Sequence, residues 1–335
     1  MQTSKEVVKA AVEFTTPERL PVIFGRLGDT DVHRVGWNQI GTGDNEKPYT
    51  LDEWQCGWQR TDVRNMGQVK THPLDEWDNL TGFRWPNPDD PAFYAGMEEK
   101  FAGSDGKYIT TGIFMLLFER LHSLRGFENM LGDLYLEKEK ISDLADRIVE
   151  FDLEIIKNIN SRFPGRIDGF TFTDDWGTEQ ALIVSPALWR EFFMPRYKRI
   201  FDACHKAGWH VWMHSCGKVN EAIPMLIEIG CNVLDLQQPR LLGIEEVGAK
   251  FAGKVCFQST CDIQHTLPIK SVPEIQEEAK LLMECWGTEK GGFILSDYGN
   301  EEAIGSTKEK TRVMYDAFIS NDRYAKKSGY RRHNI

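Results

Sequence analysis

The sequence has no run of about 18 apolar residues, so it predicts no helix that crosses a membrane. Residues 1–9 are polar and charged, so we expect no secretory signal there. Basic side chains are the minority, 40 against 51 acidic ones, and the formal net charge of −11 argues against nucleic acid as a partner. A small molecule or another protein remains as the expected partner.

The seven cysteines are an odd number and lack the spacing of a disulfide framework. We therefore expect free or metal-bound thiols in a reducing, cytoplasmic compartment. The sequence also has no G-x-G-x-x-G stretch after an apolar run, which removes the main reason to expect an open nucleotide-binding sheet.

Short apolar runs alternate with segments of helical spacing, which is typical of a parallel sheet. Seven strands are clear, and an eighth, less certain strand is expected near residues 52–58. About eight such units favour an α/β fold of the distorted (β/α)8 TIM-barrel type, formed by one domain over residues 1–335 with a hairpin-containing excursion at about 45–100. The clear strand candidates are residues 20–24, 108–114, 167–173, 209–214, 233–236, 254–258 and 292–296.

Residues 209–217 read Trp-His-Val-Trp-Met-His-Ser-Cys-Gly and carry the strongest chemical signal. Side chains repeat with a period of two along a strand, so His214 and Cys216 point to the same side, within about 7 Å of each other. An imidazole and a thiol at this spacing can share one metal ion. By themselves these residues fit a core histidine and an inert cysteine at least as well, and their place at a strand end is what favours the metal.

Ligands of such barrels bind at the carboxyl ends of the strands, where polar residues follow most of the predicted strands. Catalytic zinc takes about four ligands and leaves one position to the substrate, so a third protein ligand is expected from Cys261, Asp297, Asp174 or Asp175. Ordinary exposure to water is the simpler explanation for Asp29, Asp31, Gln237 and Tyr298. The strand-end residues are Arg26, Asp29, Asp31, Asp174, Asp175, His214, Cys216, Gln237, Gln238, Cys261, Asp262, Asp297 and Tyr298.

Several stretches resemble the uroporphyrinogen decarboxylase superfamily, and in particular its methyltransferase-like branch. The likeness covers nearly the whole chain and implies a distorted (β/α)8 barrel with its active-site cleft at the carboxyl ends of the strands. The stretches are Thr16–Val22, Asp52–Trp58, Asp174–Thr178, His214–Gly217 and Gly291–Leu295.

The resemblance implies one of two activities. The decarboxylase branch has an Arg-Gln-Ala-Gly-Arg motif after the first strand that this chain lacks, because Arg26 stands in an unrelated context. The other branch transfers methyl groups to or from a corrinoid on a partner protein, with zinc held by a His-x-Cys-Gly pair and a later cysteine. His214 and Cys216 match the pair, but residues 296–300 contain no cysteine. Asp297 as a ligand would leave zinc more Lewis acidic, which suits removal of a methyl group from an ether.

We therefore expect a zinc-dependent methyltransferase that moves a methyl group between a methyl ether or thiol and a corrinoid (cobalamin) on a partner protein. The metal ligands would come from His214, Cys216, Cys261 and Asp297. Either carboxylate of the Asp174-Asp175 pair would orient the substrate or donate a proton.

Trp176, Arg26, Gln237 and Tyr298 are expected to contact the substrate. A metal-free decarboxylase that depends on Arg26, and a barrel that only binds a tetrapyrrole or corrinoid, are the two alternatives. The family likeness also implies a homodimer.

Overall fold

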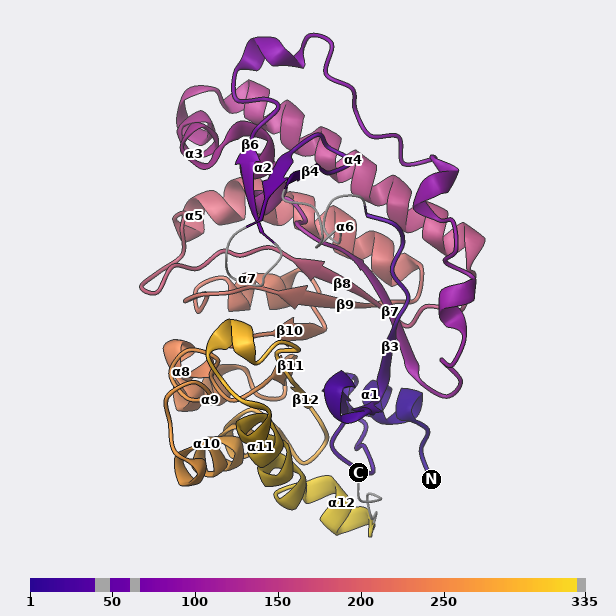
Figure 1. Ribbon diagram of the computed structural model, residues 1–335, viewed down its shortest axis with the longest axis vertical. Helices are drawn as coiled ribbons and strands as arrows, with labels where there is room; N and C mark the ends of the chain where they lie inside the picture. The colour runs from indigo at the N-terminus through magenta and orange to yellow at the C-terminus, as the bar shows by residue number, and fades with distance from the viewer. Residues whose placement is uncertain (40–48, 61–66, 330–335) are drawn as a thin grey trace.

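The computed structural model describes residues 1–39, 49–60 and 67–329 (Figure 1). Its centre is a nearly closed sheet of short parallel strands, with β2 (Asp29–Thr30) added antiparallel beside β1. Neighbours run in the order β1-β12-β11-β10-β9-β8-β7-β3, and every pair in this series is parallel. The architecture is therefore the expected α/β barrel. Its strands are β1 (Val22–Phe24), β3 (Val32–Arg34), β7 (Tyr108–Ile113), β8 (Gly169–Thr173), β9 (His210–His214), β10 (Val233–Asp235), β11 (Cys256–Ser259) and β12 (Phe293–Ser296).

Helices cover the outside of this sheet (Figure 1). The longest, α4, buries Ile141, Leu144, Ala145 and Ile148, and this spacing of three and four residues gives it one apolar face against the core. None of the described helices combines the length and the hydrophobicity needed to cross a bilayer. The outer helices are α2 (Phe118–Arg125), α3 (Phe127–Leu136), α4 (Lys138–Arg162), α5 (Pro186–Leu188), α6 (Met194–Lys206), α7 (Ile223–Glu228), α8 (Pro239–Leu242), α9 (Ile244–Phe251), α10 (Val272–Cys285), α11 (Lys308–Ser320) and α12 (Arg323–Ser328).

The eighth barrel strand is β3, and residues 52–58 do not supply it. They belong to a separate antiparallel sheet of β4 (Tyr49–Leu51), β5 (Gly57–Gln59) and β6 (Gln68–Thr71). The alternating pattern at 52–58 is interrupted because the Asp52 carboxylate accepts hydrogen bonds from the backbone N–H groups of Trp54 and Cys56, which bends the chain into a turn.

The amino-terminal end of the barrel is closed by α1 (Ser4–Val12). Its apolar side chains Val8, Ala11 and Val12 enter a core cluster inside the barrel, together with Trp212 of β9 and Ile294 of β12. A second, larger cluster fills the space between the strands and the outer helices. The interior is thus packed at the base, which leaves the opposite end, at the carboxyl ends of the strands, as the place for a ligand.

Asp31 lies at this closed base, although its position after the first strand predicted the opposite end. The reason is β2, which runs back antiparallel to β1 and returns the chain to the base before β3 begins. There the Asp31 carboxylate pairs with both terminal nitrogens of Arg19 at 2.6 and 2.5 Å and accepts further hydrogen bonds from Ser4 Oγ and Val22 N. Burial acts to raise the pKa of Asp31, but Arg19 outweighs it and the pKa lies below its ordinary value.

Candidate metal centre

Strand β9 carries His214 to the open end of the barrel. Its side chains alternate, so Val211 and Met213 pack outward against the helix layer while Trp212 packs inside the barrel. His214 has the same parity as Trp212 and is the last residue of the strand. It lies opposite Thr173 of β8 in the register, and the next residues along that neighbouring chain are Asp174 and Asp175.

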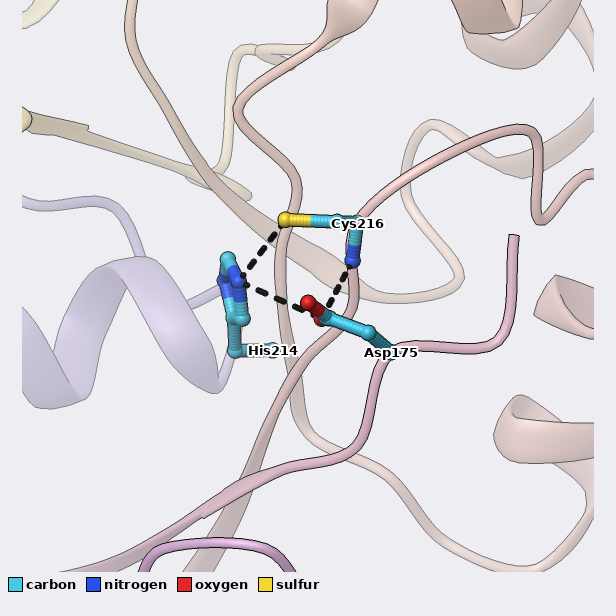
Figure 2. Close-up of side chains that lie close together, drawn as sticks. All are labelled: Asp175, His214 and Cys216. Carbon is cyan, nitrogen blue, oxygen red and sulfur yellow. Dashed lines mark hydrogen bonds and ion pairs between the residues drawn. The ribbon is translucent and has the colours of Figure 1, made fainter. Parts of the chain in front are cut away.

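Three side chains converge there, as Figure 2 shows: Asp175, His214 and Cys216. His214 Nε2 lies 3.4 Å from Cys216 Sγ and 3.7 Å from Asp175 Oδ1. One potential ligand atom from each residue falls within 4.8 Å of the others. Nitrogen, sulfur and oxygen ligands of tetrahedral zinc are about 3.3–3.8 Å apart, so the three atoms can hold a zinc ion with little movement.

A second carboxylate fixes the orientation of the imidazole. Asp235 of β10 is the register partner of His214, and its Oδ2 lies 3.2 Å from His214 Nδ1. Gln237 in turn donates from Nε2 to Asp235 Oδ1 at 3.3 Å. A proton kept at Nδ1 leaves Nε2 as the metal-binding atom, which is the usual arrangement of zinc-bound histidines. Burial acts to lower the pKa of His214, but Asp235 and Cys216 outweigh it and raise the pKa well above its ordinary value.

Close contact between two glycines allows the two ligand-bearing loops to meet. Gly177 N donates to the carbonyl of Cys216, and a Cβ on Gly217 would lie 2.2 Å from the Gly177 carbonyl oxygen. Gly217 also has φ of 81°, which residues with a Cβ rarely adopt. Both loops therefore need glycine, and their approach also lets Cys216 N donate to Asp175 Oδ1 at 2.8 Å.

Asp174 and Asp175 have different environments. The Asp174 side chain is fully buried, and its carboxylate accepts hydrogen bonds from the N–H groups of Leu117, Phe118 and Glu119 and from the Tyr197 hydroxyl. Burial raises its pKa to about 6, although these hydrogen bonds act in the opposite direction. Asp174 therefore stabilises the amino-terminal end of α2, whereas Asp175 faces the cluster.

Two further metal-ligand candidates lie outside the group of three. Cys261 is fully buried, and its Sγ donates to the Ile275 carbonyl at 3.6 Å, toward α10. Asp297 is half-buried after β12, and its backbone N–H donates to the Ile23 carbonyl. Neither the Cys261 thiol nor the Asp297 carboxylate is among the ligand atoms that converge with His214 and Cys216.

The expected substrate-contacting residues are also separated. Trp176 is fully buried, stacks on Phe118 at 4.1 Å between ring centroids and donates from Nε1 to the Tyr197 hydroxyl, so it is part of the core. Tyr298 is 40% exposed, and its partial burial, followed by the charge of Cys216, raises its pKa. The side chain of Arg26 lies outside the described part of the structure.

Sequence patterns did not point to Glu119, in the first turn of α2. Burial and the negative charges of Asp175 and Asp174 raise its pKa well above the ordinary value. Its Oε2 atom is buried and has no hydrogen-bond partner among the described residues. Asp235 was also missed, and only the register of β9 and β10 could have identified it.

The fold and these contacts define a class of protein: an α/β barrel with a possible metal centre at the carboxyl ends of its strands. A family model described as "Uroporphyrinogen decarboxylase (URO-D)" matches residues 109–318, more than half of the chain. The chain therefore belongs to the uroporphyrinogen decarboxylase family. The search of curated proteins found no match.

One solved structure shares the fold over nearly its full length. A methyltransferase from Methanosarcina mazei aligns with a TM-score of 0.69 at 14% identity, over 96% of this chain and 99% of that one. A glycosylated endo-β-1,4-xylanase from Gloeophyllum trabeum aligns with a TM-score of only 0.42 at 10% identity, over 70% of this chain and 82% of that one. The first match extends the shared fold over 96% of the chain, beyond residues 109–318.

Proposed function

We propose that this protein is a zinc-dependent methyltransferase that moves a methyl group between a small methyl donor or acceptor and a corrinoid on a partner protein. The observation that carries the proposal is the convergence of Asp175, His214 and Cys216 at the open end of the barrel. The methyltransferase from Methanosarcina mazei, which has the same fold over nearly its full length, adds support.

The donor set fits zinc and favours an oxygen substrate. One nitrogen, one sulfur and one oxygen ligand leave a fourth position open, as in catalytic zinc sites. When bound, zinc would polarise the oxygen of a methyl ether or favour the thiolate form of a thiol. Asp175 donates less charge than a second cysteine would, so zinc held by this donor set would be a stronger Lewis acid and would suit methyl ethers.

The protein's own groups supply orientation and a proton. Asp235 holds the His214 ring through Nδ1, and Gln237 holds Asp235. Burial and the nearby carboxylates raise the pKa of Glu119, which favours the protonated form of its carboxyl group. When the methyl group leaves as the equivalent of CH₃⁺, the oxygen atom keeps the electron pair of the broken bond and takes this proton, which releases a neutral alcohol.

The first test is the zinc content of the purified protein. We expect about one zinc per chain in the wild type and almost none in Cys216→Ala or His214→Ala. Cys285→Ala is the matched control, because Cys285 is half-buried on α10, outside the cluster, and its replacement should leave zinc unchanged. Equal zinc in wild type and Cys216→Ala, or none in either, would contradict the proposal.

The second test is methyl transfer to free reduced cobalamin, followed by its absorbance during a screen of methyl ethers and methyl thioethers. We expect methylation with at least one methyl ether, and its loss in Cys216→Ala. A decarboxylation that survives a chelator would support the metal-free lyase instead. Tetrapyrrole binding without turnover of any methyl donor would support the other alternative, a barrel that binds a tetrapyrrole or corrinoid without catalysis.

A further inference from the structure

Four ionisable side chains around α2 keep buried polar atoms that have no hydrogen-bond partner within the described ranges. An unsatisfied buried polar atom costs about 1–3 kcal/mol, so a folded protein rarely keeps several in one region without a water or ligand to meet them. Two of these atoms, one donor and one acceptor, belong to a single pair of residues. The four atoms are Glu53 Oε2, Glu119 Oε2, Arg120 Nη2 and Asp152 Oδ2.

Glu53 and Arg120 form this pair, and it is incompletely closed. Arg120 Nη1 makes a short contact of 2.6 Å with Asp52, but Nη2 lies 3.7 Å from Glu53 Oε1, beyond hydrogen-bond distance. Both side chains are only 2% exposed. A structural ion pair at this depth would normally close to about 2.8 Å, so the unused donor and acceptor point to a third group that belongs beside them.

Neighbouring contacts hold the pair in this arrangement. Gln39 donates from Nε2 to Glu53 Oε1 at 3.4 Å and to the Phe114 carbonyl at 3.2 Å, and its Oε1 accepts from Phe114 N. Asp52, which holds Arg120 on the other side, is itself fixed by Trp58 Nε1 at 3.1 Å. Neither partner can swing to close the gap without losing these contacts, so the two free atoms are preorganised for a ligand.

The pair lies at the same end of the barrel as the metal cluster. Gln39 is bonded to Phe114, which directly follows the last residue of β7, and His214 ends β9, two strands away across β8. At about 4.8 Å per strand, the ends of β7 and β9 are about 10 Å apart. The rings of Phe114 and Trp58, with centroids 6.1 Å apart, provide apolar surface beside the pair. The spacing of about 10 Å between the two strand ends is similar to the length of a substituted benzene ring.

We propose that Glu53 and Arg120 form a substrate subsite that binds a hydroxyl group at the end of the methyl donor remote from its methyl group. The hydroxyl oxygen accepts from Arg120 Nη2, and its hydrogen is donated to Glu53 Oε2. A hydroxyl supplies both an acceptor and a donor, which matches the two free atoms. The subsite rests on the proposed function and narrows its substrate to hydroxylated aromatic methyl ethers.

Charge argues against a carboxylate in the same place. The one guanidinium at this place, Arg120, is already paired with Asp52, and the Glu53 carboxyl lies 3.7 Å from its other terminal nitrogen. A substrate carboxylate would be repelled by the Asp52 and Glu53 carboxyl groups more than Arg120 attracts it. A neutral hydroxyl group is not repelled in this way. The subsite is therefore expected to select against methoxybenzoates.

The test is equilibrium binding by titration calorimetry, without corrinoid, of 4-methoxyphenol, methoxybenzene and 4-methoxybenzoate. Wild type should bind 4-methoxyphenol about 10- to 100-fold more tightly than methoxybenzene, as hydrogen bonds to charged groups imply. It should bind 4-methoxybenzoate more weakly than 4-methoxyphenol. Equal binding of the phenol and methoxybenzene would show that only water occupies the pair, and would overturn the subsite. Because no methyl transfer is measured, this result is independent of the test of the proposed function.

Glu53→Met removes the acceptor at similar length and should reduce the preference for the hydroxyl to less than about threefold. Glu53→Gln keeps a weaker acceptor and should give an intermediate preference, and it decides the question if Glu53→Met does not fold. Glu139→Gln, exposed on α4, is the matched control and should keep the full preference. Zinc content checks that each variant retains the metal cluster. An unchanged preference in both Glu53 variants would overturn the subsite.

Discussion

The two ends of the barrel differ in how completely their buried ionisable groups are hydrogen-bonded. At the base, Asp31 is paired with both terminal nitrogens of Arg19 and receives further hydrogen bonds from Ser4 and Val22. At the open end, buried atoms of Glu53, Glu119 and Arg120 have no such partner within the described residues. The base is a completed structural network, whereas the open end keeps unused donors and acceptors close to a possible metal centre.

This difference indicates where function resides without reference to residue types. Buried charges are common to both ends, so burial and charge do not mark a site. Incomplete hydrogen bonding of buried groups does mark a site. Each unsatisfied group lowers the stability of the fold and is retained where a ligand satisfies it. Substitutions should therefore destabilise the base strongly and the open end little, and the following predictions, ordered by the expected free-energy change, test this contrast.

The largest effect is expected from Asp31→Ala. The substitution leaves Arg19 buried without its partner, which should lower the free energy of unfolding by about 3–5 kcal/mol. Urea unfolding of the purified variant measures this value. Asp316→Ala is the control, because Asp316 pairs with Arg312 on the surface and its loss should cost less than about 1 kcal/mol. Similar losses in the two variants would show that the base network is not a special source of stability.

Asp235→Asn should weaken zinc binding by about 10- to 100-fold, because the carboxylate orients His214 and increases its basicity. Competition with a metal indicator measures the dissociation constant. Asp202→Asn, which changes an exposed carboxylate paired with Lys198, should leave it unchanged. Equal zinc affinity in wild type and Asp235→Asn would mean that Asp235 does not support the cluster.

His122 should make stability depend on pH. Burial, and then the positive charges of His72 and Arg120, lower its pKa from 6.5 to about 4. The unfolded chain therefore takes up the proton first, and the free energy of unfolding should fall as the pH drops from 6.5 to about 4, by up to about 1.4 kcal/mol per pH unit. Urea unfolding across this range should show a shallower slope for His122→Gln than for wild type. Parallel slopes would exclude His122 as the cause.

The smallest change in stability is expected from Glu119→Gln. Because Glu119 Oε2 is buried without a partner in the part of the chain described here, the neutral amide should leave the free energy of unfolding unchanged or raise it by up to about 1 kcal/mol. Methyl transfer should nevertheless fall at least tenfold, since the amide cannot donate the proton of a carboxyl group. A loss of stability as large as that of Asp31→Ala would remove the contrast between the two ends.

Much of the barrel could be predicted from the sequence because buried parallel strands are continuous apolar runs, and the runs around Tyr108, Phe170 and Phe293 all correspond to strands. The three-residue strand β3 could not be found, because Val32, His33 and Arg34 carry no such run and no α-helix separates them from β1, only a single 3-10 turn and β2. For the same reason, residues 52–58 were the better candidate on pattern alone.

The proximity of His214 and Cys216 was predictable from the period of two along β9, but the third side chain of the cluster was not. Asp174 and Asp175 are adjacent and face different surroundings, so only the loop conformation decides which of them meets His214. Asp235 and Glu119 approach the cluster through strand register and helix placement. Neither relation is encoded in spacing along the chain, so contacts that come from tertiary structure remain outside the reach of sequence patterns.

Helix α1, which closes the amino-terminal end of the barrel, also affects when the barrel can finish folding. Gly292 N donates to the Ala11 carbonyl, and Thr16 N donates to the Lys290 carbonyl, so the first helix is held by the last strand. During biosynthesis α1 leaves the ribosome before the barrel strands do, and its apolar face stays uncovered until β12, the last strand of the barrel, has been made. Contacts between such distant segments are slow to form. We expect nascent chains that end before β12 to expose Val8, Ala11 and Val12 and to depend on chaperones.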